Sequence, residues 1–204
     1  MACRFLYLMR HGEATDAGVL SQNGEQQARL AGERLRDVPL TAIHHSPQAR
    51  ARRTAEILSG YLPGVPVRES ELIDDVIPSD PDLSQLPAAY ASFVSSYPPE
   101  ERADGAKIAR AALGEFAGPP GGAADADAHE LLVTHNFVIG WFVRDALGAE
   151  DWRWLGLNQQ NAALTVIIYR PELPPALVSF NDASHLTRPL RWTGFPAALR
   201  PATC

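Results

Sequence analysis

The chain of 204 residues contains little cysteine, almost no lysine and no long hydrophobic run. Its two cysteines, Cys3 and Cys204, stand at opposite ends, so a disulfide framework is not expected. The apolar run near the N-terminus ends at Met9, which makes it too short for a signal peptide or a membrane span. The sequence therefore predicts a cytoplasmic protein with no membrane partner.

Positive charge is also scarce, because 18 basic residues stand against 24 acidic ones and the formal net charge is −6. Lys107 is the only lysine, so the remaining basic residues are arginines. An acidic protein of this kind is not expected to bind nucleic acid or an anionic membrane surface. Arginines that converge at one place can still bind a small anion.

Composition places the chain among globular proteins. Hydrophobic residues make up 46% and charged residues 21%, which suits one domain over residues 1–204 with a sizeable core. Short apolar runs alternate with amphipathic segments along most of the length. This alternation predicts an α/β fold with three α-β-α layers and a mainly parallel central sheet.

The expected elements follow from apolar periodicity and from capping residues. Ser21 is expected to cap a helix, and Ser46 with Pro47 to begin another. Strands are expected at residues 5–9, 41–45, 67–73, 130–134, 162–169 and 176–180. Helices are expected at residues 21–36, 46–62, 87–95, 99–116 and 136–147. Residues 118–129 are rich in glycine, alanine and aspartate and are predicted to form an exposed loop.

Basic and histidine side chains follow several of the expected strands. Arg10 and His11 come directly after the first strand, Arg50 lies shortly after the second, and His135 follows the strand at 130–134. Ligands of open parallel sheets bind beyond the carboxyl ends of the strands, so we expect these side chains to converge. Guanidinium groups and helix N-termini bind phosphate oxygens, which predicts an anion pocket at this edge.

Five blocks of the chain, in order, resemble the signatures of the histidine phosphatase (phosphoglycerate mutase-like) superfamily. The blocks are Leu8–Glu13, Leu20–Ala28, Ser46–Ala55, Leu132–His135 and Asn161–Thr165. Within this superfamily, residues 61–65, 104–108 and 152–158 are similar to a branch of mitochondrial serine/threonine phosphatases. The resemblance implies a phosphoglycerate mutase-like fold and the hydrolysis of a phosphomonoester without a metal or another cofactor. That branch carries a membrane anchor with no counterpart here, so we keep the expectation of a cytoplasmic location.

The resemblance also implies a role for each site residue. His11 would attack phosphorus and form a phosphohistidine, while Arg10, Arg50 and His135 would bind the phosphoryl group. The family places a glutamate after the third strand as general acid and base. Asp75 stands at this position and Asp74 is adjacent, so either carboxylate is a candidate.

Other functions remain open at this point. A phosphoglycerate-type mutase is less favoured, because the residues that hold phosphoglycerate in the mutases are not recognisable. A catalytically weak phosphate-binding module is favoured only by the changed acid position. The substrate is expected to be a phosphorylated small molecule or a phosphoprotein. The tail at 184–195 is rich in arginine and aromatic residues, and we expect it to fold over the pocket or to help form a homodimer.

Overall fold

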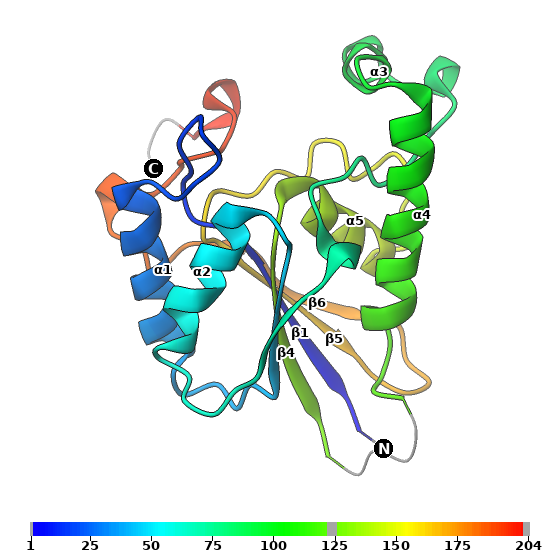
Figure 1. Cartoon of the computed structure of the whole chain (residues 1–204). Coiled ribbons are helices and arrows are strands. Elements are labelled where there is room, and N and C mark those ends of the chain that lie inside the picture. The colour runs from blue at the N-terminus through cyan, green and yellow to red at the C-terminus, as the bar shows by residue number, and fades with distance from the viewer. Residues whose placement is uncertain (1, 122–125, 202–204) are drawn as a thin grey trace.

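The computed structural model describes residues 2–121 and 126–201. The strands are β1 (Arg4–Arg10), β2 (Ala42–His45), β3 (Val67–Glu69), β4 (Ala128–Thr134), β5 (Leu164–Tyr169) and β6 (Ala176–Asp182). The α-helices are α1 (Gln22–Leu35), α2 (Ala49–Ser59), α3 (Ala88–Ser95), α4 (Pro99–Phe116) and α5 (Asn136–Ala146). The six strands form one sheet in the order β3-β2-β4-β1-β5-β6, with helices on both faces (Figure 1).

Strand direction decides which segments meet at the edge of the sheet. Strands β3, β2, β4 and β1 run parallel, whereas β5 joins β1 and β6 joins β5 in the antiparallel sense. The predicted three-layer α/β fold is therefore confirmed, with an antiparallel pair at one side of the sheet. Met9 pairs with Leu164, so the residues before β5 lie beside the carboxyl end of β1.

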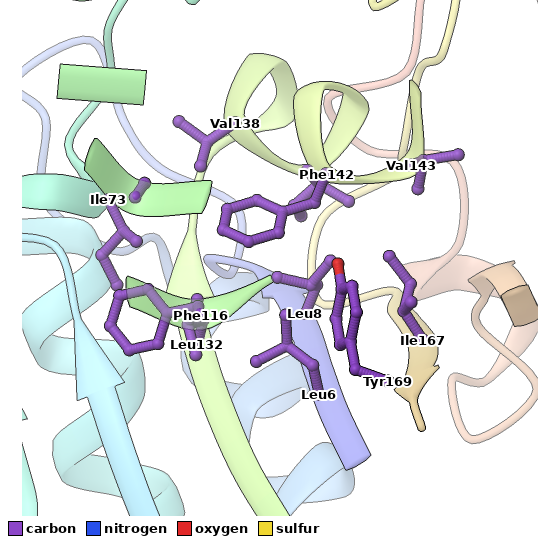
Figure 2. Packing of buried hydrophobic residues seen from close by; sticks show 12 residues of the cluster. Leu6, Leu8, Ile73, Phe116, Leu132, Val138, Phe142, Val143, Ile167 and Tyr169 are labelled. Atoms are coloured by element: carbon purple, nitrogen blue, oxygen red, sulfur yellow. The ribbon is translucent and has the colours of Figure 1, made fainter. Parts of the chain in front are cut away.

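The alternation of side chains along β1 supplies both faces of the sheet with core residues. Leu6 and Leu8 point to the face that α4 and α5 cover, where they pack with Phe142 of α5 (Figure 2). Met9 points to the opposite face and packs with Leu35 of α1 and with residues of α2. A strand buried on both faces needs an apolar residue at nearly every position, as this run has.

The structure corrects several predicted boundaries. The second helix begins at Ala49 and not at Ser46, because the backbone of Gln48 is still extended, with ψ of 136°. The strand expected at 67–73 ends at Glu69, and Glu71–Ile73 forms a 3₁₀ turn. The strand expected at 162–169 begins only at Leu164.

Two further predictions fall partly or wholly outside the described residues. The loop expected at 118–129 includes residues 122–125, which are not described, and its last residues already belong to β4. Cys204 also lies outside the described residues. In the part of the chain that is described, no helix is both long and apolar enough to cross a membrane.

Candidate active site

The carboxyl ends of three neighbouring parallel strands bring the predicted site residues to one edge of the sheet. Arg10 is the last residue of β1, and His11 follows it. Arg50 lies in the first turn of α2, which follows β2. His135 follows β4 and is the N-cap of α5. Asp74 and Asp75 come after the 3₁₀ turn that follows β3. The candidate residues therefore come from four segments, each at the carboxyl end of a different strand.

His11 is buried and has a defined hydrogen-bond pattern. Its Nδ1 lies 2.7 Å from the carbonyl oxygen of Gly12, which can only accept a hydrogen bond. Its Nε2 accepts a hydrogen bond from Nε of Arg50 at 3.2 Å. The proton of the neutral ring therefore belongs on Nδ1, which leaves the lone pair of Nε2 facing Arg50. Burial, reinforced by the charges of His135 and the arginines, lowers the pKa of His11 to about 3.

The backbone around His11 is fixed by contacts from both sides. The His11 amide donates to the Thr134 carbonyl at 3.0 Å, and Nδ2 of Asn161 donates to the His11 carbonyl at 3.0 Å. The loop after His11 packs directly on α1, since a Cβ at Gly12 would lie 2.5 Å from the carbonyl oxygen of Gly24. Only glycine permits this approach of two backbones. The imidazole is thus held by the strand ends and by the first helix together.

Arg50 connects the other candidates. Its Nη2 donates to Oδ2 of Asp75 at 2.7 Å and lies 3.4 Å from Nδ1 of His135. Its Nε reaches His11. One guanidinium group therefore touches both histidines and one carboxylate, which places a fixed positive charge at the centre of the site.

His135 is held from its opposite ring nitrogen. Its Nε2 lies 2.8 Å from Oγ of Ser46, and Ser46 donates to Oδ1 of Asp74 at 3.0 Å. Because the serine proton is given to Asp74, Nε2 of His135 acts as the donor to Ser46. Burial is the main cause that lowers the pKa of His135 to about 3, and the charge of Arg50 adds to it. His135 also begins α5, whose N-terminal amide groups favour an anion at this place.

The two adjacent carboxylates have different partners. Asp75 lies at 2.7 Å from Arg50 and 3.5 Å from Nδ1 of His135. Asp74 accepts from Ser46 and from the amide of Asp75 at 2.8 Å. Asp75 thus faces Arg50 at the centre of the cluster, whereas Asp74 accepts a hydrogen bond from Ser46.

Arg10 is bound by backbone carbonyl groups. Its Nη1 donates to the carbonyl oxygens of Gln159 and Gly194, both at 2.7 Å. Its Nε is buried and has no hydrogen-bond partner among the described residues. Burial lowers the pKa of Arg10 to about 10. The tail therefore does reach the site, through Gly194, while the homodimer stays a prediction.

Sequence patterns missed several contributors to the site. Gln159 and Gly194 act through main-chain oxygens, which no side-chain pattern reveals. Ser46 was assigned to a helix cap, although its hydroxyl group joins His135 to Asp74. The only indication of this role in the sequence was that the block Ser46–Ala55 resembles a signature of the superfamily. Among the described residues, no cluster of three or more His, Cys, Asp and Glu side chains is arranged to hold a metal ion.

Comparison with known proteins shows what the chain is similar to. The family model described as histidine phosphatase superfamily (branch 1) matches residues 6–77, which contain His11, Arg50 and both acidic candidates. A mouse protein named serine/threonine-protein phosphatase PGAM5, mitochondrial, is 30% identical over 196 residues that cover 91% of this chain. Residues 6–77 are thus similar to the histidine phosphatase superfamily, and most of the chain is similar to the mouse phosphatase. The chain spans 65% of the length of that mouse relative.

Solved structures of the superfamily share the fold. A phosphoglycerate mutase from Bacillus anthracis gives a TM-score of 0.70 at 16% identity, covering 90% of this chain and 95% of that one. A mycobacterial glucosyl-3-phosphoglycerate phosphatase gives 0.64 at 22% identity, covering 89% and 100%. Identities this low establish the α/β architecture alone.

The relatives correct one expectation. Several similar proteins carry the word mitochondrial in their names, including those from mouse, human and Caenorhabditis briggsae. The prediction of a cytoplasmic location, drawn from the short apolar run at the N-terminus, is therefore wrong by comparison with these relatives. The physical reason is that apolar run length excludes a membrane span but does not specify a compartment.

Proposed function

We propose that this chain is a phosphatase that hydrolyses phosphomonoesters through a covalent phosphohistidine on His11. The observation that carries the proposal is the hydrogen bond at the imidazole: Nε2 of His11 accepts from Nε of Arg50 at 3.2 Å. A nitrogen that accepts carries no proton, and burial lowers the pKa of His11 to about 3, so the ring is expected to be neutral. A neutral nucleophile can approach a dianionic phosphate without charge repulsion. The arginine beside it marks where the phosphoryl oxygens would lie.

The first step would transfer the phosphoryl group from the substrate oxygen to His11. The lone pair of Nε2 forms a bond to phosphorus while the bond from phosphorus to the ester oxygen breaks. Arg10 would contribute its unpartnered Nε, and Arg50 its guanidinium group, to the nonbridging oxygens. His135 would bind them as well, supported by the N-terminus of α5.

The second step would return the enzyme to its resting state. In the first step Asp75 would protonate the leaving oxygen. In the second step it would accept a proton from the attacking water. Water attacks phosphorus, the bond to Nε2 breaks and inorganic phosphate forms. We assign this role to Asp75 because it lies at 2.7 Å from Arg50 and 3.5 Å from His135. Asp74 would instead orient His135 through Ser46.

No step of this sequence requires a metal ion or another cofactor, because the arginines and α5 supply the positive charge. The name of the mouse relative describes a serine/threonine-protein phosphatase, which makes a phosphoprotein one candidate substrate. The mycobacterial structure is named as a glucosyl-3-phosphoglycerate phosphatase, so a phosphorylated small molecule is the other candidate. A mutase is the alternative reaction, and it would need a bisphosphate primer.

The proposal is tested by the hydrolysis of phenyl phosphate in the presence of EDTA. We expect wild type to remain active and His11→Ala to lose activity by at least about 10³-fold, as for other nucleophile deletions. His129→Ala is the matched control, because that imidazole stacks on Phe5 at the far end of β1. Rapid quenching in alkali with radiolabelled substrate should trap label on wild type and not on His11→Ala. Activity abolished by EDTA, or label on His11→Ala, would contradict the mechanism.

The same assay separates the alternatives. A mutase would convert one phosphoglycerate isomer into the other and would be stimulated by a bisphosphoglycerate primer. A phosphate-binding module would bind inorganic phosphate but release none from any ester. Hydrolysis without primer dependence is the expected result.

A further inference from the structure

A cavity with aromatic walls includes Asn136, the residue that follows His135 in the chain. It has a volume of about 320 Å³ and lies between α3, the start of α5 and the segment before β5. Its main walls are Tyr90 and Phe93 of α3, Phe137 of α5 and Trp154. The ring of Phe137 meets Phe93 at 5.7 Å and Trp154 at 5.1 Å between centroids, both edge to face. These preferred contacts of aromatic rings hold the walls in place.

The lining decides what the cavity can accept. Among the described residues that line it, none has a charged side chain. The indole N–H of Trp154 is already bonded to Oγ of Ser79 at 2.8 Å. A carboxylate or ammonium group would therefore lose its hydration without gaining a charged partner, which is costly. An apolar group would gain burial instead.

The size of the cavity fits an aromatic ring with a short attachment. An apolar cavity of about 150 Å³ can already bind benzene, and ligand sites begin near 300 Å³. Gly156 also lines the cavity and lies against Tyr90: a Cβ at Gly156, where φ is +89°, would lie 2.7 Å from the hydroxyl oxygen of Tyr90. Glycine at this position therefore preserves the shape of the cavity.

Asn136 connects the cavity to the candidate phosphate site. Asn136 lines the cavity and directly follows His135. Oδ1 of Asn136 accepts from the amide of Gln159 at 2.8 Å, and the carbonyl of Gln159 accepts from Arg10 at 2.7 Å. Helix α3 lies toward the same end of the molecule as the carboxyl end of β4, after which α5 begins (Figure 1). A phosphate held by Arg10 and His135 would thus have its ester group beside the cavity.

We propose that this cavity binds the alcohol part of the substrate and selects phosphomonoesters whose alcohol carries an aromatic ring. The inference rests on the proposed phosphatase function and adds the substrate class to it. It also disfavours phosphoglycerates, because their carboxylate would meet an uncharged lining.

Two exposed neighbours on α3 provide a matched test. Ala89 lines the cavity, whereas Ala88 is exposed and does not. In Ala89→Phe the added ring would occupy the cavity, and in Ala88→Phe an equal ring would point elsewhere. Neither change removes a core side chain, and equal thermal midpoints will show that both variants fold. The measured quantity is the ratio of kcat/KM for phenyl phosphate to kcat/KM for glycerol phosphate.

We expect Ala89→Phe to lower this ratio about tenfold or more, in line with the effect of filling an apolar specificity pocket. Ala88→Phe should keep the wild-type ratio. An unchanged ratio in Ala89→Phe, or an equal loss on both substrates, would overturn the proposal while leaving the phosphatase function intact.

Binding of two phosphonates separates failure of the cavity from failure of the reaction. Calorimetry would compare phenylphosphonate with methylphosphonate, neither of which the proposed chemistry can hydrolyse. Wild type and Ala88→Phe should bind the phenyl compound more tightly, and Ala89→Phe should not. If no ester is hydrolysed but this preference is present, the proposed function fails and the aromatic subsite stands. If wild type shows no preference, the subsite is refuted.

Discussion

Nε of Arg50 donates a hydrogen bond to Nε2 of His11 across 3.2 Å. The two residues belong to different crossovers, since His11 follows β1 and Arg50 lies in the helix after β2. In the sheet these strands are separated by β4. The contact therefore exists only when all three strand ends are assembled, and it joins the proposed nucleophile to the group proposed to bind the phosphoryl oxygens.

Replacement of Arg50 by lysine should strongly reduce catalysis. Lysine keeps the charge but cannot direct separate N–H groups to His11 and Asp75. We expect Arg50→Lys to lower kcat/KM for phenyl phosphate about 10²-fold. Arg52→Lys is the control, because Arg52 pairs with Glu69 on the surface. A similar loss in both variants would indicate a general effect of charge or folding.

The two acidic candidates should respond differently to the leaving group. Asp75→Asn should lower kcat/KM for phenyl phosphate about 10²-fold and for nitrophenyl phosphate much less, because nitrophenolate leaves without a proton. Asp74→Asn should affect both substrates equally, since Asp74 contacts Ser46 and not the centre of the site. The comparison of kcat/KM for the two esters measures this, because kcat/KM reports the step in which the alcohol leaves. A leaving-group effect confined to Asp74→Asn would transfer the acid role to Asp74.

Stability should depend on pH through His11. The pKa of His11 is lowered to about 3 in the folded state, against an ordinary value near 6.5. Below pH 6.5 the unfolded chain binds a proton that the folded chain does not, so stability is lost as pH falls from 6.5 toward 3. Between pH 8 and pH 5 wild type should therefore lose about 2 kcal/mol more than His11→Gln. Denaturant unfolding at both pH values tests this, and parallel losses would refute it.

The close approach of the His11 loop to α1 should make Gly24 intolerant of a side chain. A Cβ at Gly24 would lie 2.1 Å from the carbonyl oxygen of Glu13. We expect Gly24→Ala to lower the free energy of unfolding by about 1–3 kcal/mol and to reduce activity. Gly114→Ala is the control: Gly114 lies within α4, and a Cβ there would meet no described heavy atom within 4 Å outside its own helical turn. This change should raise stability by up to about 1 kcal/mol. Thermal and denaturant midpoints of the two variants provide the measurement.

The order of elements was readable from the sequence because each has a local cause. Leu6 and Leu8 are buried on one face of the sheet and Met9 on the other. Because both faces are covered, the sequence of β1 shows an unbroken apolar run. Ser21 was predicted to cap α1, and its Oγ accepts from the amide of Gly24 at 3.0 Å. The prediction that Ser46 and Pro47 begin α2 was wrong, because Gln48 has an extended backbone with ψ of 136° and is the N-cap. The Ser46 hydroxyl group accepts from the amide of Gln48 and also joins His135 to Asp74.

The sequence by itself determined the alternation of strands and helices, and it placed Arg10, His11, Arg50 and His135 after strand ends. Short-range patterns carry this information, since burial period, caps and strand ends are properties of neighbouring residues. The tertiary structure alone decided that Asp75 faces Arg50 while Asp74 turns to Ser46. It also brought the carbonyl of Gly194 to Arg10 from the far end of the chain. Adjacent carboxylates are equivalent in a sequence, and a backbone oxygen leaves no mark in it, so only the packed chain distinguishes them.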